Sequence, residues 1–486
     1  MFYGSSMGTS EELARLFVKK LLLCDVKANV MDLQNTTLDL FRATLKNIIL
    51  VFFVSTTGLG EMPRSMQKLW NSLKQRSCTT LPITFAAFGC GDSSYGDNFN
   101  RAIRLISARL TQLGATQVGS IGFGDVQAGR GVRDAFDIWS EEILGLLALK
   151  MNNHILPPML QISSSEYNLD LMKTNAVVVY NERMTDLNHF QDVRIIRFKC
   201  EASYEAGDVA VIKPRNDPAT VLEVYEFLKN FVRDLPGFDQ PIRLTPSRAD
   251  CPFQIGSYTL RLILTNIFDL NQPPGQSVFD YLATLCTASS YTEKLMELAQ
   301  DYDLYEDYVT KPRRTTHEVL LDFKNFLNPS FLDLFEIFPI IKPRYFSIAS
   351  PPNTEQVLEL CVARVEYKTI LKRQRFGLCS RYLCDLKAGT NLNISVESGT
   401  MKVSKDASHF ILLGAGTGIS PLRSIIGSLE GKDIWLIQGC RYVSKDGLFN
   451  EEFKNIRHTI KGSRDQAKKI YLQDTMQEES TAPVLW

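Results

Sequence analysis

A glycine-rich turn directly after an apolar run is the sequence feature that most constrains the fold. The run ends at Leu413 and leads into Gly414-Ala415-Gly416-Thr417-Gly418, after which the chain has a helical pattern. Glycine lets a backbone approach an anion closely, and the following helix start adds free N–H groups and the positive end of a dipole. This pattern predicts a parallel α/β unit with a dinucleotide as the leading ligand, although a turn of this kind can also simply join two elements.

The composition sets the number of domains and excludes several classes of function. A chain of 486 residues with 44% hydrophobic content is expected to form about three domains with buried cores. Its 54 basic and 54 acidic residues balance, so the net charge does not indicate binding to nucleic acid or a membrane surface. The 10 cysteines form no CxxC pair and no spacing typical of zinc, which argues against a metal site and favours a reducing compartment. We find no apolar stretch of about 20 residues and no signal peptide, so we expect a cytoplasmic protein.

The pattern of apolar residues divides the chain into segments. Residues 1–150 alternate apolar runs with helical patterns, which predicts an α/β domain with a parallel sheet. Residues 151–174 contain paired asparagines, paired prolines and a serine run, and we interpret them as a linker. Short β-branched runs over 175–403 predict a β-barrel, into which a leucine-rich helical pattern over about 217–316 is inserted. Residues 404–486 return to alternating strand and helix patterns.

Polar loops directly follow the predicted strands of the first domain. They are the segments 4–10, 55–61 and 89–95. Because the carboxyl ends of parallel strands share one edge of a sheet, hydroxyl and backbone N–H groups are expected to converge there on a phosphate. Ordinary N-capping by serine and threonine is the alternative for the first loop. Tyr95 in the third loop supplies a flat face that could stack on an aromatic ring.

Together with Gly122-Phe123-Gly124-Asp125, these loops resemble in order and spacing the four FMN loops of the flavodoxin module in diflavin reductases. The resemblance implies that a phosphate is held by the first loop, that the second borders the FMN ring, that an aromatic residue stacks on it, and that an acid lies beside the ring or ribityl chain. The residues that match are, in that order, Ser5, Ser6, Gly8 and Thr9; Thr56, Thr57 and Gly58; Tyr95; and Asp125.

A second signature lies in the barrel domain, where Arg344-Tyr345-Phe346-Ser347 is followed by Gly377-Leu378-Cys379-Ser380. Arginine can bind a pyrophosphate through two hydrogen bonds, and an aromatic ring can cover a flavin face, although such a strand alone is more often structural. The pair of segments resembles the FAD site of ferredoxin reductase-type modules. The resemblance implies that Arg344 and Ser380, with the loop that contains Gly377 and Cys379, bind the pyrophosphate of FAD. It also implies that Phe346 stacks on the isoalloxazine and that Ser347 lies near its reactive nitrogen as a catalytic residue.

The last domain contains a cluster suited to a ribose 2′-phosphate. Ser463 and Arg464 are followed by Lys469 and Tyr471, which combines a hydroxyl, two cations and an aromatic ring. A solvated charge cluster is the alternative, but the resemblance places NADPH here, with Gly416 and Thr417 at the glycine turn. It also implies that Arg441 approaches this cofactor and that the C-terminal Trp486 stands where relatives keep a catalytic aromatic residue over FAD.

Only three strands are predicted in this last domain, at 410–413, 433–438 and 469–472. A doubly wound sheet of order 3-2-1-4-5-6 binds its dinucleotide where the order reverses, beside strands that follow these three. We therefore expect an incomplete NADPH-binding domain over 404–486, from alternative splicing or an incompletely predicted gene product.

The resemblance covers nearly the whole chain and implies a multidomain α/β protein. It predicts a flavodoxin-like doubly wound sheet, an FAD-binding β-barrel with a helical insertion, and a partial Rossmann-like NADP-binding domain. Residues 189–194, with Phe346 and the compact linker, resemble the branch that serves cytosolic iron–sulfur cluster assembly. The implied path runs from NADPH through FAD and FMN to an anamorsin-type iron–sulfur protein. Two alternatives stay open: a cytochrome P450 reductase-like donor to haem proteins, and a flavin-binding, hydride-incompetent module that binds partners. A flavodoxin-like regulator without FAD is a third.

Overall fold

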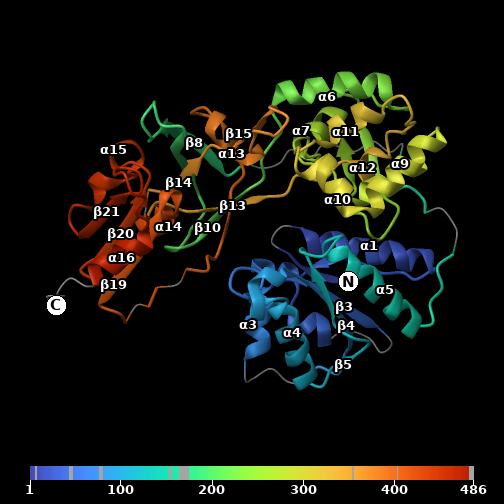
Figure 1. Ribbon diagram of the computed structural model, residues 1–486, viewed down its shortest axis with the longest axis horizontal. Coiled ribbons are helices and arrows are strands. Elements are labelled where there is room, and N and C mark those ends of the chain that lie inside the picture. Colours follow the sequence, from blue (N-terminus) through green and yellow to red (C-terminus); the bar gives the residue numbers. More distant parts are fainter. Residues whose placement is uncertain are drawn as a thin grey trace.

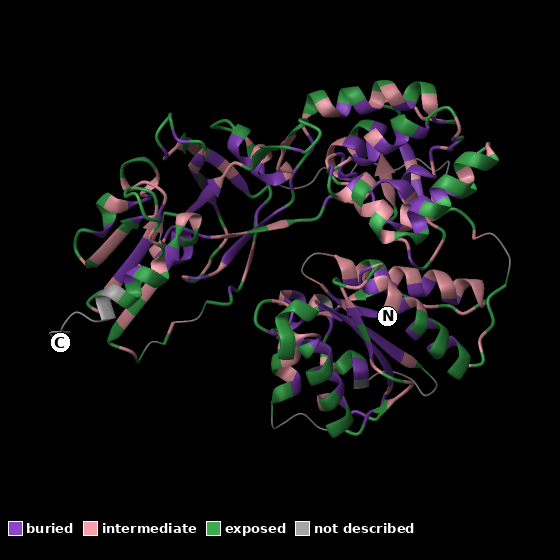
Figure 2. Ribbon diagram, in the orientation of Figure 1, coloured by how far each residue is buried: buried purple, intermediate pink, exposed green. Residues whose placement is uncertain are grey.

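The computed structural model describes residues 1–5, 8–42, 48–75, 80–152, 156–163, 174–352, 355–401, 403–404 and 406–480. The elements form an N-terminal α/β module, a barrel, a helical region inserted into the barrel, and a C-terminal α/β module (Figure 1). Each has a buried interior, seen as purple strands and helix faces in Figure 2. Among the described residues, no helix combines the length and apolar character needed to cross a bilayer.

The N-terminal module is built on a parallel sheet of order β2-β1-β3-β4-β5, with β6 also paired to β4. The strands are β1 (Phe2–Gly4), β2 (Met31–Asp32), β3 (Ile49–Ser55), β4 (Thr84–Gly91), β5 (Thr116–Gln117) and β6 (Gly122–Asp125). The helices are α1 (Thr9–Leu23), α2 (Leu38–Arg42), α3 (Arg64–Lys74), α4 (Arg101–Gln112) and α5 (Val132–Leu146). This strand order is that of flavodoxin, so the predicted doubly wound sheet is confirmed.

Apolar residues on both faces of the central strand explain why helices cover this sheet on two sides. In β3, Phe52 and Val54 belong to the cluster that packs against α3 and α4. Val51 and Phe53 belong to the cluster that contains residues of α1 and α5. Successive side chains of a strand point to opposite faces, so a continuous apolar run requires cover on both.

The barrel consists of two antiparallel sheets around one shared cluster of buried residues. One sheet has the order β14-β9-β8-β17, with β8 (Ala176–Arg183), β9 (Val193–Cys200), β14 (Val357–Ala363) and β17 (Asn391–Leu392). The other has the order β13-β10-β18, with β10 (Val209–Ile212), β13 (Arg344–Ser347) and β18 (Ser395–Glu397). Helix α13 (Leu378–Asp385) packs into the cluster through Leu383 and Cys384, and the hairpin β15 (Glu366–Lys368) and β16 (Gln374–Phe376) precedes it.

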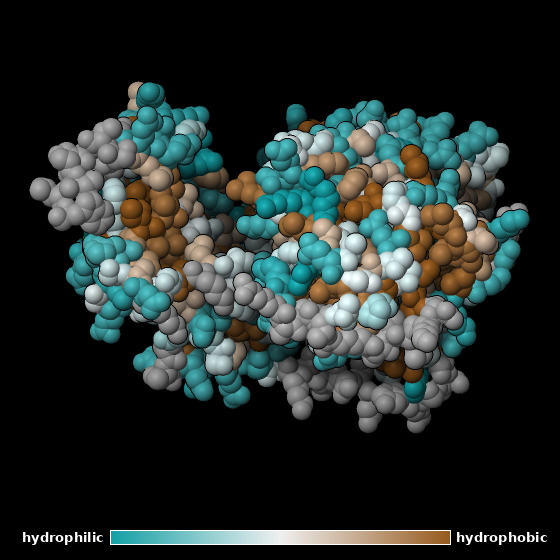
Figure 3. All heavy atoms as spheres, turned by 90° about the horizontal axis from the view of Figure 1, so that it is seen from below, coloured by the Kyte–Doolittle hydropathy of each residue, from teal (hydrophilic) through white to brown (hydrophobic). Residues whose placement is uncertain are grey.

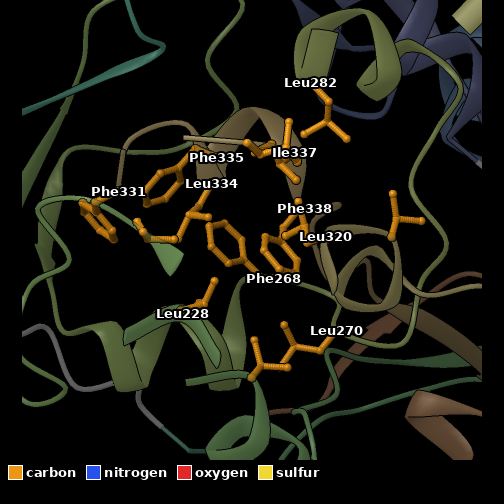
Figure 4. Packing of buried hydrophobic residues seen from close by; sticks show 14 of the residues in the cluster. Leu228, Phe268, Leu270, Leu282, Leu320, Phe331, Leu334, Phe335, Ile337 and Phe338 are labelled. Atoms are coloured by element: carbon orange, nitrogen blue, oxygen red, sulfur yellow. The ribbon is translucent and has the colours of Figure 1, made fainter. Parts of the chain in front are cut away.

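The helical region inserted into the barrel has a core of its own (Figure 4). Its helices are α6 (Pro218–Phe231), α7 (Leu260–Asn266), α8 (Ser277–Thr284), α9 (Ser289–Gln300), α10 (Tyr302–Tyr305), η3 (Glu306–Thr310), α11 (Thr316–Phe323) and α12 (Leu334–Ile337). Phe268 lies edge-on to Phe335 of α12 at 5.0 Å and stacks with Phe338 at 5.2 Å. The helical pattern therefore continues past residue 316, because α12 completes the same core.

A small sheet joins this helical region to the segment interpreted as a linker. Strand β11 (Ile242–Pro246) pairs with β12 (Gly256–Tyr258) and, on its other edge, with β7 (Leu160–Ser163). Leu160 is buried in the core of the helical region. Residues 160–163 are therefore a structural part of that region.

Within the part of the C-terminal module that the structure describes, three parallel strands lie in the order β19-β20-β21, and α14 (Ile419–Ile426) connects the first two. Strands β19 (His409–Ala415) and β20 (Asp433–Cys440) confirm two of the three predicted strands. The third prediction, at 469–472, is wrong, because β21 is Arg457–Gly462 and helix α16 (Leu472–Ser480) begins at the predicted place. The Asp474 carboxylate accepts a hydrogen bond from the Tyr471 N–H at 2.8 Å, which favours a helix start.

The barrel and the C-terminal module share one hydrophobic cluster. Val193 and Ala349 of the barrel pack there with Ile419 and Leu422 of α14 and with Phe449 of the C-terminal module. Burial of apolar surface between the two favours a fixed arrangement. In the view of Figure 3, apolar residues also gather on the outer surface of the C-terminal module.

Candidate functional site

The four loops predicted for FMN begin at the same level of the parallel sheet. The register pairs Gly4 with Val54, Ser55 with Cys90, and Gly91 with Asp125, so β1, β3, β4 and β6 end side by side. Because β1 lies between β2 and β3, this edge is the point where the strand order reverses. Ligands of open α/β sheets bind at such a point.

The first loop leads into helix α1 through Gly8, whose φ of +98° favours glycine. The Gly8 N–H donates to Ser5 Oγ at 2.7 Å, and the Ser5 N–H donates to Ser65 Oγ at 3.1 Å. No side chain of the described residues caps α1 at Gly8, so the N–H groups of its first turn, which begins at Thr9, remain available to an anion. Ser6 lies outside the described residues.

The second loop is a tight turn that Gly58 and Gly60 make possible, since their φ values are +52° and +92°. Thr57 closes the turn by accepting hydrogen bonds from the Gly60 and Glu61 N–H groups at 3.1 and 2.7 Å. Thr56 is tied to the neighbouring loop, because its N–H donates to the Cys90 carbonyl and its Oγ1 accepts from the Ala102 N–H. Gly58 therefore projects at an exposed tip beside the switch point.

Asp125 connects the third and fourth loops. Its carboxylate accepts hydrogen bonds from the backbone N–H groups of Ser93 and Gln127, both at 3.0 Å. Burial acts to raise the pKa of Asp125, but the hydrogen bonds from Ser93 and Gln127 outweigh it and hold the pKa below its ordinary value. Tyr95 stands on this connected surface and is 55% exposed, which leaves a ring face open to a planar ligand.

In the barrel, strand alternation places Arg344 and Phe346 on one face of β13 and Ser347 on the other. The Phe346 ring is half-buried against the barrel cluster. Arg344 Nη1 donates to the carbonyl of Lys342 at 2.7 Å. Arg344 and Phe346 therefore share the face on which the predicted pyrophosphate and ring contacts would be made.

Helix α13 begins close to Arg344 and provides a second group of backbone donors. Burial raises the pKa of the Cys379 thiol to about 12, and the charge of Arg344 opposes this rise, so Arg344 lies within electrostatic range of the first turn. A Cβ atom on Gly377 would lie 2.7 Å from Ser380 Oγ and 2.8 Å from Val365 Cβ, so only glycine fits there. Ser380 Oγ accepts from the Val365 N–H at 3.0 Å and donates to the Gly377 carbonyl at 3.2 Å. The Ser380 hydroxyl thus holds the loop in shape.

The glycine turn of the C-terminal module follows β19, as predicted. Gly416 has a φ of +52°, and a short helical turn over Gly416–Gly418, with Thr417 at its centre, leads into α14. A Cβ atom on Gly414 would lie 2.8 Å from Leu422 Cδ1, which shows how closely strand and helix approach. A close strand-to-helix turn of this kind agrees with the prediction of a pyrophosphate site, which stays a prediction.

The loops after β20 and β21 are joined to each other. The Ser463 N–H donates to the Cys440 carbonyl at 2.8 Å, and the Arg464 N–H donates to the Arg441 carbonyl at 2.9 Å. Arg464, Lys469 and Tyr471 are exposed at this edge. The structure therefore brings Ser463 and Arg464 next to Arg441, whereas Trp486 lies outside the described residues. The roles predicted for all these residues remain predictions.

The sequence reasoning missed Lys342 near these loops, and it used Phe190 only as part of the family resemblance of residues 189–194. Lys342 of the barrel reaches the first loop of the N-terminal module, where its Nζ occupies the space that a Cβ atom on Gly8 would need. Phe190 of the barrel lies against Arg441, with the guanidinium carbon 4.1 Å from the ring centre. Both contacts are between modules, and no local pattern could have indicated them.

Comparisons with known proteins agree with this arrangement. A family model described as "Flavodoxin" matches residues 1–139, and one described as "FAD binding domain" matches residues 174–382. The curated protein "NADPH-dependent diflavin oxidoreductase 1" of Schizosaccharomyces pombe is 34% identical, over 98% of this chain and 88% of its own length. Proteins of the same name from Candida albicans and Danio rerio are each 31% identical, over 98% and 100% of this chain and 87% and 89% of their own lengths.

Proposed function

The chain belongs to the NADPH-dependent diflavin oxidoreductases, and we propose that it carries electrons from NADPH through FAD and FMN to a protein acceptor. The observation that carries this proposal is that a helix starts at a glycine without a side-chain cap in each of three modules: Gly8 before α1, Gly377 before α13, and the turn Gly416–Gly418 before α14. The chemistry that the bound flavins supply is the conversion of a two-electron donor into single electrons.

For FMN, the residues of the switch point fit the group by their donor chemistry. The open N–H groups at Thr9 and the hydroxyl of Ser5 suit a phosphate, and the exposed ring of Tyr95 suits an isoalloxazine face. Asp125 holds its two neighbouring loops together through backbone hydrogen bonds. We assign Thr56, Thr57 and Gly58 to the opposite border of the ring.

For FAD, Arg344 and the first turn of α13 supply positive charge and N–H groups of the kind a pyrophosphate accepts. Glycine at 377 lets the first turn of α13 pack closely against Val365 and Ser380, which keeps the loop before the helix in one shape. We assign Phe346 to a flavin face and Ser347 to its reactive edge.

For NADPH, the turn at Gly416 and Thr417 suits the pyrophosphate, and Ser463, Arg464, Lys469 and Tyr471 suit the ribose 2′-phosphate. The glycine turn follows β19 and the cluster follows β21, the two strands that flank β20 in one parallel sheet, which supports one continuous ligand across the strand ends. Such a site selects NADPH over NADH, because NADH has no 2′-phosphate to pair with the cations Arg464 and Lys469.

The modules are arranged so that the N-terminal module docks against both parts of the central region (Figure 1). Arg64 forms an ion pair with Glu397 at 3.3 Å and donates to the Ser398 carbonyl at 2.6 Å. Lys19 of α1 forms an ion pair with Glu336 of α12 at 2.8 Å. These contacts support direct transfer between the two flavin-binding modules.

We further propose an anamorsin-type iron–sulfur protein as the acceptor, in cytoplasmic iron–sulfur cluster assembly. The resemblance of residues 189–194 to that branch supports this choice over a haem protein. The test is to mix the reduced chain with either acceptor and compare the rates of electron transfer. Faster reduction of a haem protein would refute this acceptor.

The reductase function is tested by adding NADPH without oxygen to the purified chain after both flavins have been identified in its spectrum. We expect the flavin absorbance to bleach within minutes, and NADH to be a weaker donor. A chain that holds both flavins and does not bleach would be a partner-binding module, and a chain that holds no FAD would be a flavodoxin-like regulator.

A further inference from the structure

The loop between β8 and β9 of the barrel is ordered by hydrogen bonds of its own. The Arg183 side chain stabilises the loop by donating hydrogen bonds to the backbone carbonyls of Thr185, Asp186 and His189 at 3.1, 2.8 and 2.8 Å. Thr185 Oγ1 donates to the Gln191 carbonyl at 2.8 Å and so closes the base of the loop. The loop is therefore held in one shape before anything binds to it.

The loop docks on the turn of the C-terminal module that carries Arg441. The Asp186 N–H donates to the Lys445 carbonyl at 2.9 Å, and His189, only 6% exposed, lies with its Nε2 3.8 Å from the Asp446 carboxylate. The same carboxylate accepts from the Arg441 N–H at 2.9 Å. Loop and turn are thus linked through Asp446.

The loop carries an aromatic side chain, Phe190, that contacts Arg441. Phe190 is 66% exposed, an unfavourable state for a large apolar ring, and the Arg441 guanidinium covers it at 4.1 Å from the ring centre. A planar guanidinium stacked on a ring loses its freedom of rotation while its N–H groups remain available for hydrogen bonds. The contact therefore limits the positions that the Arg441 guanidinium can take.

Arg441 stands between the two parts of the proposed NADPH site. The parallel register pairs Ala415 with Gly439 and Cys440 with Gly462, so the loop of Arg441 lies between the glycine turn and the loop of Ser463 and Arg464. A ligand that spans both would carry its pyrophosphate past Arg441.

We propose that Phe190 is a positioning residue for NADPH: its ring holds the Arg441 guanidinium in place for the pyrophosphate of the dinucleotide. The inference rests on the proposed function and adds a residue of the barrel to the recognition of a ligand bound mainly by the C-terminal module. Affinity for NADPH is thereby coupled to the docking of the two modules.

The test compares two probes on the full chain. In Phe190→Ala we expect the dissociation constant of NADP⁺ to rise about fivefold, equivalent to about 1 kcal/mol. The dissociation constant of adenosine 2′-phosphate, which lacks the pyrophosphate, should stay unchanged. Phe190→Trp should restore the binding of NADP⁺, because it keeps a ring face for the guanidinium.

Leu187→Ala is the matched control, since Leu187 is 83% exposed in the same loop and the contact with Arg441 is made by Phe190. It should change neither constant. In the double variant Phe190→Ala/Arg441→Ala, the loss should be close to that of Arg441→Ala alone, because the ring acts through the arginine.

Three results would overturn the inference: unchanged binding of NADP⁺ in Phe190→Ala, an equal loss for both probes, or additive losses in the double variant. Failure of the proposed function is distinguishable, because an unaltered chain would then bind neither probe. Retention of FAD in the spectrum of each variant shows that the barrel is folded.

Discussion

Arg423 of α14 donates a hydrogen bond to the carbonyl of Ala349 in the barrel at 3.0 Å and forms an ion pair with Glu359 of β14. The guanidinium also forms an ion pair with Glu452 at 2.6 Å, and it lies 4.6 Å from the ring centre of Phe449. One partly buried cation thus joins the C-terminal module to the barrel.

Removing this cation is expected to destabilise both modules. In Arg423→Ala, the buried Glu359 carboxylate keeps Arg197 as an ion-pair partner and loses Arg423, and the loss of such a charged hydrogen bond typically costs about 1.5–3 kcal/mol. The measurement is hydrogen exchange of the amides of β20 and β14 in the flavin-bound chain. The matched control is Arg261→Ala, whose ion pair with Asp239 is exposed and should contribute at most about 1 kcal/mol. Equal protection in both variants would contradict this account.

Docking of the N-terminal module is expected to depend on pH through Glu11. Lys342 of the barrel forms an ion pair with the Glu11 carboxylate at 3.0 Å. Burial acts to raise the pKa of Glu11, but Lys342 and Arg15 outweigh it and lower the pKa below its ordinary value. The charged Glu11 therefore stabilises docking fully at pH values above the ordinary pKa of a free carboxyl. This stabilisation is lost as the pH falls through the lowered pKa and Glu11 becomes protonated.

The measurement is the radius of gyration by small-angle X-ray scattering. It should increase as the pH falls through that range, and at neutral pH it should be larger in Glu11→Gln than in the unaltered chain. Asp239→Asn removes an exposed carboxylate within the helical region and should leave the radius unchanged. A Glu11→Gln chain as compact as the unaltered one would show that this pair does not hold the modules together.

The glycine-containing turns of the candidate sites could be predicted from the sequence, because such turns depend on residues that are close together in the chain. The glycines at 58, 377 and 416 mark turns whose shape depends on a few neighbouring residues. The structure places Gly58 in the turn that follows β3, Gly377 directly before α13 and Gly416 directly after β19. The roles of these residues in binding remain predictions, since no ligand contact tests them.

What could not be predicted depends on distant partners. Strand β7 forms because β11, about 80 residues later, offers it an edge, and nothing in residues 160–163 indicates this. Strand β21 has charged residues at both ends and is recognisable mainly by its pairing with β20, whereas Tyr471 and Leu472 looked like a strand but begin a helix. Phe190 looked like a family marker until its contact with Arg441 was visible.

Gly8 is expected to be required for FMN binding beyond its effect on stability. Its φ of +98° makes Gly8→Ala strained by about 1–2 kcal/mol, and the added methyl would meet Lys342 Nζ where the phosphate loop opens. The measurement is the FMN content of the purified chain, which should fall.

Gly389→Ala is the control, because Gly389 has a similar φ of +86° and open space around its Cβ position. It should lower the melting temperature by a similar amount without loss of FMN. If both variants lost FMN equally, the effect of Gly8→Ala would be one of general stability.

The outer edge of β19 is expected to cause self-association. Within the described residues β19 pairs only with β20, and Ile411 and Leu413 are exposed along it. A strand edge with unpaired backbone groups and apolar side chains can pair with a second copy. Ile411→Lys should therefore reduce the association that light scattering detects as the protein concentration rises. Ile138→Lys, which adds the same charge at an exposed isoleucine of helix α5, should not reduce it. Equal reduction by both would mean that added net charge, and not the strand edge, governs the association.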